Sequence, residues 1–207
     1  MKILLIDTST SNILVSILDE NKILYLYNEK IISNMSSKIL PIIDNGLKEQ
    51  NLKLNDINKI FVVNGPGSFT GIRVGVTVAK TIAWALKKEI VPISSLELIA
   101  TTNTHKKYVV PMIDARRGNV FAGIYDNNLN CIKLDKLVNL EEFVSNLNND
   151  YEFVSYDKID NEKVINPNID VLKIIKKHIN DESINAHNLN PNYLKLTEAE
   201  ENKLKND

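Results

Sequence analysis

Short apolar runs broken by polar turns dominate the first half of the chain, and their lengths predict strands that alternate with helices. Three runs at hairpin spacing predict antiparallel strands, and a later run that is almost purely apolar is typical of a fully buried strand. Apolar residues at helical spacing predict a helix before that buried strand and a longer one after it. The expected strands are 2–9, 12–20, 22–30, 59–65 and 89–94, and the expected helices are 36–50, 68–86 and 95–103.

The second half begins with a segment that repeats the start of the chain. Asp7 and Asp114 each end an apolar strand, and a four-residue turn leads from each to an asparagine, Asn12 or Asn119. Asp114 lies 107 residues after Asp7, about half of the chain. This spacing predicts a duplicated domain that opens with an Asp-tipped hairpin, although two similar hairpins could also coincide by chance. The predicted domains are 1–103 and a smaller 104–207, with the boundary in the polar stretch 101–107.

Beyond residue 126 the hydrophobic pattern is weaker. Short helices are expected at 140–147 and 169–179, with a strand at 151–158 between them. The charged tail 198–207 is expected to fray, because it offers no apolar face to bury.

Composition limits the functional classes. The chain has 207 residues, of which 43% are hydrophobic and 25% charged, as in ordinary globular proteins. A formal net charge of −1 excludes the basic bias of a stand-alone nucleic-acid binder, so contact with RNA would need a partner's positive charge. The first apolar run is too short for an export signal, and no run approaches a membrane span of about 20 residues. We therefore expect a cytoplasmic protein without membrane contact.

A glycine-rich turn precedes the longest predicted helix, in the segment VVNGPGSFTGIRVGVTVAKTIAWAL at 62–86. Ser68 or Thr70 can cap this helix, whose first amides would attract an anion. A nucleotide-hydrolysing loop of the Walker type needs lysine and then serine or threonine after its last glycine. Here Ile72 and Arg73 follow Gly71, so this loop is not expected to hydrolyse a nucleotide.

The same helix carries a stripe of small residues at four-residue spacing, formed by Gly71, Gly75, Ala79 and Ala83. A glycine within a helix costs about 0.8–1.0 kcal/mol relative to alanine, so the two glycines suggest a compensating close contact. The stripe could pack on the domain's own sheet or on a helix of another subunit. The second alternative makes it a docking surface, with Arg73 and Lys80 beside it.

Four segments together resemble the TsaB (YeaZ) family of bacterial proteins. They are ILLIDTST near the N-terminus, NGPGSFTGIRVG before the long helix, MIDARRGNVF at the second hairpin and NPNYLK near the end. The resemblance runs from residue 1 to about 126 and returns at 191–195; the segment 127–190 could not be aligned. It implies an α/β fold of the actin/sugar-kinase/Hsp70 (ASKHA) type, a duplicated fold of mixed sheets flanked by helices.

The resemblance also implies a function in tRNA modification. Family members are non-catalytic partners of the TsaD-type transferase, which places a threonylcarbamoyl group on the adenosine beside the anticodon. A TsaE-type ATPase is expected in the same complex, and tRNA is expected to contact mainly the partner. ATP and metal are expected on the transferase, with no tightly bound cofactor on this chain.

Binding to the transferase, and self-association, are implied to use the two helices of the first domain. With the docking alternative for the stripe, the expected interface residues are Ile39, Ile42, Ile43, Gly71, Arg73, Gly75, Val76, Ala79, Lys80 and Ala83. Members of this fold that bind nucleotides hold phosphate and magnesium at the hairpin tips. Asp7, Thr8, Ser9 and Asp114 could retain such contacts, or the aspartates could order their turns by accepting backbone hydrogen bonds.

No catalytic or metal-binding residue is expected in this chain. The resemblance places the metal-binding histidines of the transferase at Ser95 and Ile99 of this sequence, and isoleucine cannot bind a metal. His105, His178 and His187 lack ligand spacing and are expected at the surface. The alternative functions are a stand-alone small-molecule kinase or ATPase, which would use Asp7, and a peptidase, against which the missing ligands argue.

Overall fold

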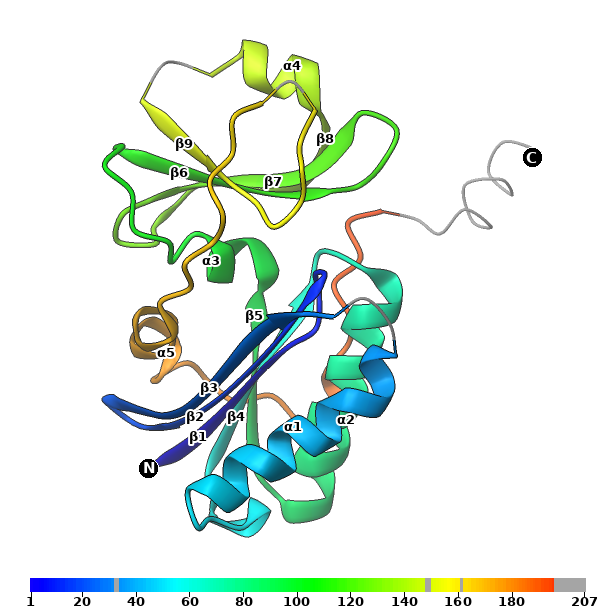
Figure 1. The fold of residues 1–207 in the computed structure, drawn as a ribbon, viewed down its shortest axis with the longest axis vertical. Coiled ribbons are helices and arrows are strands. Elements are labelled where there is room, and N and C mark those ends of the chain that lie inside the picture. The colour runs from blue at the N-terminus through cyan, green and yellow to red at the C-terminus, as the bar shows by residue number, and fades with distance from the viewer. Residues whose placement is uncertain (32–33, 148–149, 161, 196–207) are drawn as a thin grey trace, which may run out of the picture.

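Two mixed sheets, stacked end to end along the long axis, form the framework of the protein (Figure 1). The computed structural model describes residues 1–31, 34–147, 150–160 and 162–195. The first sheet has the order β3-β2-β1-β4-β5 and the second the order β8-β7-β6-β9. The strands of the first sheet are β1 (Lys2–Asp7), β2 (Asn12–Asp19), β3 (Lys22–Lys30), β4 (Lys59–Gly65) and β5 (Glu89–Ser94). Those of the second are β6 (Tyr108–Asp114), β7 (Asn119–Asp126), β8 (Cys131–Asn139) and β9 (Tyr151–Val154).

The predicted duplication is confirmed by the pairing of the strands. In the first sheet β1 pairs antiparallel with β2 and parallel with β4. In the second sheet β6 pairs antiparallel with β7 and parallel with β9 in the same way. Each sheet thus begins with an Asp-tipped hairpin whose first strand is central, which is why β1 and β6 read as continuous apolar runs.

Helices cover both faces of the first sheet (Figure 1). On one face α1 (Met35–Glu49) and α2 (Phe69–Leu86) enclose a core with Leu4, Ile6 and Val62. On the other face α3 (Ser95–Ile99) and α5 (Val171–His178) pack into a second core that also includes Phe121 and Tyr125 of β7. This second core joins the two sheets. The short α4 (Leu140–Ser145) covers the outer face of the second sheet.

The chain returns to the first sheet after the second one is complete. From Ile184 to Lys195 it runs along β5 and α2, through the short 3₁₀ turn η2 (Ala186–Asn188), and we call this the C-terminal strap. The amide of Ile184 donates to the carbonyl of Ile90 at 2.9 Å, and that of Asn192 donates to the carbonyl of Asn64 at 2.7 Å. Residues 171–195 therefore pack with the first sheet, although the predicted boundary assigned them to the second domain. The tail 198–207 lies outside the described residues.

The strand β8 was not predicted, because its sequence does not alternate clearly between buried and exposed positions. It is an edge strand that pairs only with β7 in the order of its sheet, and most of its side chains are exposed. Charged side chains on an edge strand discourage pairing with other chains, but they also hide the strand pattern. Among the described residues, no helix has both the length and the apolar character that a membrane span requires.

Candidate functional site

The stripe of small residues on α2 faces the protein's own first hairpin. An ideal Cβ on Gly71 would lie 2.0 Å from the carbonyl oxygen of Thr8, and one on Gly75 would lie 2.4 Å from its Oγ1. The hydroxyl of Thr8 donates to the carbonyl of Gly71 at 2.7 Å. Ala79 and Ala83, farther along the stripe, are also buried. The glycines let the helix backbone approach the end of β1, which is the gain that offsets their low helix propensity.

The expected docking surface is therefore wrong for most of its residues. Eight of the ten expected interface residues are buried in the core between α1, α2 and the sheet. They are Ile39, Ile42, Ile43, Gly71, Gly75, Val76, Ala79 and Ala83. Of the two alternatives for the stripe, packing on the domain's own sheet is the one that the structure has. A sequence pattern shows that a helix face is smooth, but it does not show which element covers that face.

Arg73 and Lys80, the two remaining expected interface residues, hold the C-terminal strap. Nε of Arg73 donates to the hydroxyl of Tyr193 at 2.7 Å, and the guanidinium lies over the tyrosine ring. The ring of Tyr193 also packs against Phe69 with 4.8 Å between centroids. Nζ of Lys80 donates to the carbonyl of Leu189 at 3.1 Å. Both cations thus have partners within the chain, and their expected place beside a contact with another subunit stays a prediction.

The two hairpin aspartates order their turns in the same way. Oδ1 of Asp7 accepts a hydrogen bond from the amide of Ser9 at 2.7 Å, and Oδ1 of Asp114 accepts one from the amide of Arg116 at 2.7 Å. Asp7 is buried, and burial raises the pKa of its carboxyl to about 6. Asp114 is exposed. The structure therefore contains the turn-ordering contacts that were one alternative for these residues.

The surroundings of Asp7 do not fit the magnesium-bound phosphate that the fold family suggests. Asp7 is only 6% exposed, and its carboxylate accepts a hydrogen bond from the turn. The loop before α2 lies directly on this turn, because the amide of Ser68 donates to the carbonyl of Ser9 at 2.8 Å. A Cβ on Gly67 would lie 2.2 Å from that same carbonyl. The carboxylate of Asp7 is thus almost closed off from solvent, and the loop before α2 packs closely on the turn that this carboxylate orders.

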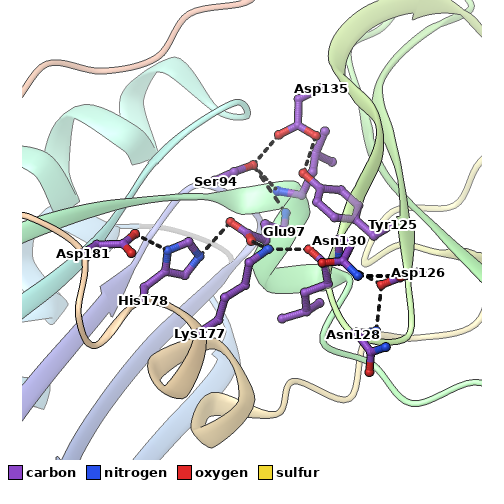
Figure 2. A network of polar contacts seen from close by, with 12 residues as sticks. Ser94, Glu97, Tyr125, Asp126, Asn128, Asn130, Asp135, Lys177, His178 and Asp181 are labelled. Atoms are coloured by element: carbon purple, nitrogen blue, oxygen red, sulfur yellow. Dashed lines mark hydrogen bonds and ion pairs between the residues drawn. The ribbon is translucent and has the colours of Figure 1, made fainter.

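A cluster of charged side chains joins α3, α5 and the second sheet (Figure 2). His178 lies between two carboxylates, with Nε2 3.0 Å from Oε2 of Glu97 and Nδ1 2.6 Å from Oδ2 of Asp181. Nζ of Lys177 donates to Oε1 of Glu97 at 2.5 Å and also to the carbonyl of Leu129. Nearby, Asp135 of β8 accepts hydrogen bonds from Ser94 and Tyr125. These contacts fix the two sheets relative to one another.

The neighbours of His178 determine its protonation. Burial lowers the pKa of the imidazole, but its contacts with Glu97 and Asp181 outweigh burial, so the pKa lies above its usual value. Burial likewise opposes ionisation of Glu97, yet His178 and Lys177 bring the pKa of its carboxyl below the usual value. The expected surface position is wrong for His178, whose side chain is only 14% exposed. Nothing in the local sequence signals the contact with Glu97, because Glu97 lies about 80 residues before His178.

The chain is similar in sequence to proteins of one named family. Residues 29–165 match the model of the TsaD family, described as tRNA N6-adenosine threonylcarbamoyltransferase. The chain belongs to this family. The resemblance to TsaB is also confirmed, since the chain is 40% identical over 126 residues to the tRNA threonylcarbamoyladenosine biosynthesis protein TsaB of Bacillus subtilis. It is 31% identical over 135 residues to TsaB of Escherichia coli.

These matches cover only part of each protein. They include 60% of this chain and 55% of the Bacillus subtilis protein, and 64% of this chain and 58% of the Escherichia coli protein. The chain thus spans little more than half the length of these relatives. Two solved structures from Pseudomonas aeruginosa share the fold, one titled as similar to peptidase YEAZ and the other titled YeaZ. Their TM-scores are 0.80 and 0.76 at 22% identity, and they cover 94% and 93% of this chain and 99% of their own chains.

The resemblance predicts that the metal-binding helix of the transferase corresponds to α3 in this chain, which contains Ser95 and Ile99. The hydroxyl of Ser95 donates to the carbonyl of Pro66, and Ile99 is buried in the core that joins the sheets. Both side chains therefore serve packing. Within the described ranges, no three histidine, cysteine, aspartate or glutamate side chains lie close enough to hold a metal.

Large apolar side chains are exposed on the outward side of α1 and α2, whereas the small-residue stripe is buried. Trp84 is 63% exposed and Leu40 is 55% exposed. Beside Leu40 lies a mainly apolar hollow of about 500 Å³ between the two helices, and its lining includes Leu47, Leu54 and Ile82. Trp84 does not line this hollow, and its ring lies 6.3 Å from that of His187 in the C-terminal strap. We use the term outer helix surface for Leu40, Trp84 and this hollow together. Sequence reasoning missed it because the helix pattern of α2 is apolar on nearly every side.

Proposed function

We propose that this protein is a non-catalytic accessory subunit of the complex that transfers a threonylcarbamoyl group to the adenosine beside the tRNA anticodon. Its similarity to two proteins named for threonylcarbamoyladenosine biosynthesis supports the pathway. In this proposal the chain binds a TsaD-type transferase and holds it in an active arrangement. ATP and metal bind to the transferase rather than to this chain. The complex works in the cytoplasm.

The observation that carries this proposal is the outer helix surface. Large apolar side chains that remain exposed on neighbouring helices are typical of binding sites for another protein. Tryptophan is enriched among the residues that contribute most to binding, because it buries a large area with little loss of conformational freedom. Trp84 and Leu40 are thus the expected anchors, in place of the buried stripe.

Self-association through the same surface would compete with the transferase. A TsaE-type ATPase is proposed as a further member of the complex, and tRNA is proposed to contact mainly the transferase. The formal net charge of −1 supports this last point, because binding to the phosphate backbone requires an excess of positive charge.

The residues at the positions where related enzymes would bind metal or phosphate support a non-catalytic role. Ser95 and Ile99 are used in packing, and Asp7 is enclosed by the turn and by the loop before α2. The same enclosure argues against the alternative of a stand-alone kinase or ATPase, which would need Asp7 beside a magnesium-bound phosphate. A peptidase would likewise need the metal ligands that these positions lack.

Reconstitution with single omissions tests the proposed function. The mixture contains this chain, a TsaD-type transferase, a TsaE-type ATPase, an adenylate-forming enzyme, ATP, threonine, bicarbonate and tRNA. We expect modified adenosine only when this chain and the transferase are both present. Modification that is unchanged when this chain is omitted, or that this chain performs without the transferase, would contradict the proposal.

The anchor is tested by Trp84→Asp, which places a charge on the outer helix surface without touching the core. We expect at least about a hundredfold weaker binding to the transferase, as for an interface anchor worth about 3 kcal/mol. Leu134→Asp is the matched control, because Leu134 is 70% exposed on β8 of the other sheet. Titration calorimetry measures both affinities, and circular dichroism confirms that both variants fold. Unchanged binding by folded Trp84→Asp would exclude this surface as the interface.

A further inference from the structure

The last residue of α5 is a histidine that lies between two carboxylates (Figure 2). Nε2 of His178 lies 3.0 Å from Oε2 of Glu97, and Nδ1 lies 2.6 Å from Oδ2 of Asp181. Glu97 belongs to α3, whereas Asp181 lies on the segment 179–183 that joins α5 to the C-terminal strap. His178 therefore connects α5, α3 and this joining segment.

The positions of the two carboxylates require a proton on both ring nitrogens of His178. An ionised carboxylate can only accept hydrogen bonds, and a neutral imidazole has one N–H group and one nitrogen that is itself an acceptor. With a neutral ring, one carboxylate would therefore face a lone pair instead of an N–H group. Distances of 3.0 Å and 2.6 Å to the two carboxylates thus fit a doubly protonated, positively charged ring.

The location of His178 strengthens these contacts. The side chains of His178 and Glu97 are only 14% and 11% exposed, so salt and water screen their attraction weakly. The C-terminal end of α5 also favours a cation, because the helix dipole places partial negative charge there. The strand β3, which packs against α5 as well, contributes the apolar Ile23 to the core that joins the sheets.

Lys177 gives Glu97 a second cationic partner. Nζ of Lys177 donates to Oε1 of Glu97 at 2.5 Å and to the carbonyl of Leu129, in the turn between β7 and β8. Glu97 therefore stays paired when His178 loses a proton, and the contact between the two sheets at Leu129 does not depend on the histidine.

The segment after α5 is held to β4 through its backbone. Nζ of Lys59 donates to the carbonyls of Ile179 and Asp181 at 3.0 Å and 3.3 Å, and it lies 3.4 Å from Oε2 of Glu89. The side chain of Asp181 is 50% exposed, so water can solvate this carboxylate at little cost once its contact with His178 is lost. Of the two carboxylates beside the ring, Asp181 is thus the one that can move away.

We propose that His178 is a pH-dependent clamp for the segment 179–183. The doubly protonated ring holds Asp181 and Glu97 together, and loss of one proton releases Asp181 and loosens the segment. The neutral ring keeps its proton on Nε2, beside the buried Glu97, because the exposed Asp181 can turn into solvent. The inference uses neither the outer helix surface nor the transferase, so it is independent of the proposed function.

The direction of the pH dependence follows from the two carboxylates. Their contacts outweigh the effect of burial and raise the pKa of His178 above its usual value. The stabilisation by the clamp is therefore complete below the value of an unfolded histidine, about 6.5, and it is lost as the pH rises through the raised value of the folded protein. The clamp is closed in acidic solution and opens in alkaline solution.

An NMR titration of the full chain between pH 5 and pH 9 tests the clamp. The ring resonances of His178 report its protonation, and the backbone amides report the segment 179–183. We expect the ring to lose its proton at a higher pH than an unfolded histidine, about 6.5, and the amides of 179–183 to shift with the same midpoint. Loss of the proton at or below that pH, or amides that do not follow the ring, would overturn the proposal.

Asp181→Asn and Glu182→Gln form a matched pair for this titration. Both remove one negative charge from neighbouring exposed positions, but the contact with His178 belongs to Asp181. We expect Asp181→Asn to lower the midpoint of His178 and to remove the pH dependence of the amides of 179–183, because asparagine still accepts a hydrogen bond from a neutral ring. Glu182→Gln should change little. An equal fall in the two variants would indicate a general charge effect and would contradict the clamp.

His178→Gln measures what the closed clamp contributes to stability. At pH 6 we expect the equilibrium constant of unfolding, from urea denaturation, to rise at least about tenfold, as for loss of a charge-assisted hydrogen bond. The difference from wild type should narrow by pH 9, because the wild-type ring then loses its charge as well. A difference that is the same at both pH values would show a packing role alone and would overturn the proposal. Asp181→Asn, at an exposed position, keeps the test decisive if His178→Gln does not fold.

Discussion

The two Asp-tipped hairpins have the same turn and opposite surroundings. In both, the aspartate accepts a hydrogen bond from the amide two residues later at 2.7 Å. The first turn lies beneath the start of α2, and its aspartate is buried. The second turn is open, and the exposed Asp114 lines a hollow of about 650 Å³ between the two hairpin turns. The comparison shows that the turn follows from local sequence, whereas the environment of the carboxylate depends on what packs against it.

Among the substitutions that compare the two hairpins, we expect the largest loss of stability from Gly71→Ala, because α2 approaches the first hairpin closely. Gly71→Ala places a methyl group 2.0 Å from the carbonyl oxygen of Thr8, and this oxygen belongs to backbone that cannot rotate away. In an open helix the same change would stabilise the protein by about 1 kcal/mol. We expect instead a loss of about 3 kcal/mol in the free energy of unfolding, measured by urea denaturation. Equal or greater stability of Gly71→Ala would show that the helix and hairpin do not approach so closely.

Because Asp7 is buried, we expect Asp7→Asn to change the stability by an intermediate amount that depends on pH. Burial raises the pKa of Asp7 from 3.8 to about 6, so ionisation disfavours the folded state. The contribution of Asp7 to the free energy of unfolding is therefore complete below about pH 4, and it is lost as the pH rises through about 6. Asp7→Asn keeps an oxygen for the amide of Ser9 and removes the charge. A shift of about two units limits the gain to about 3 kcal/mol, and burial of the new amide reduces it, so we expect about 1–2 kcal/mol at pH 7.5.

The measurement compares urea denaturation of wild type and Asp7→Asn at pH 4 and pH 7.5. The difference between them should grow with pH, because only the wild type ionises at this position. Asp114→Asn is the control in the open hairpin, and we expect a change below about 0.5 kcal/mol, as for other exposed substitutions. A difference for Asp7→Asn that is the same at both pH values would contradict the raised pKa.

The open second hairpin predicts the smallest effect of a glycine substitution. Gly118 has a φ of 72°, but a Cβ there would have no atom of the described residues within 4 Å. Gly118→Ala should therefore cost only the conformational penalty of the left-handed region, about 1 kcal/mol. Thermal denaturation of Gly118→Ala beside Gly71→Ala measures the contrast. If both variants lost the same stability, steric enclosure of the first hairpin would not be the distinguishing feature.

Much of the fold could be predicted because its signals are local. The apolar runs at 2–9 and 59–65 predicted the buried strands β1 and β4, and Ser68 caps α2 with its side chain as expected. The repeat of Asp7 and Asp114 at equal turn positions predicted the duplicated sheets. These features depend on periodicity and on hydrogen bonds between residues near each other in the sequence, which a single sequence records.

The candidate site could be predicted only in part because its contacts are distant in sequence. The glycines at 71 and 75 indicated a close approach, but that approach is to Thr8, more than 60 residues away. Similarly, Arg73 meets Tyr193 and Glu97 meets His178 only because the chain returns to the first sheet. The strand β8 was missed for a different reason, since an exposed edge strand needs no regular apolar pattern.

The sequence by itself determined every strand except β8, the two hairpin turns, the small-residue face of α2 and the family to which the chain belongs. Only the tertiary structure decided that this small-residue face is internal, that exposed apolar side chains lie on the outward side of the helices, and that Arg73 meets Tyr193. The physical reason is that a side chain's type fixes what it can contact. Which contact it makes depends on the elements that folding brings to it, and here the C-terminal strap and the first hairpin reach α2 from opposite ends of the chain.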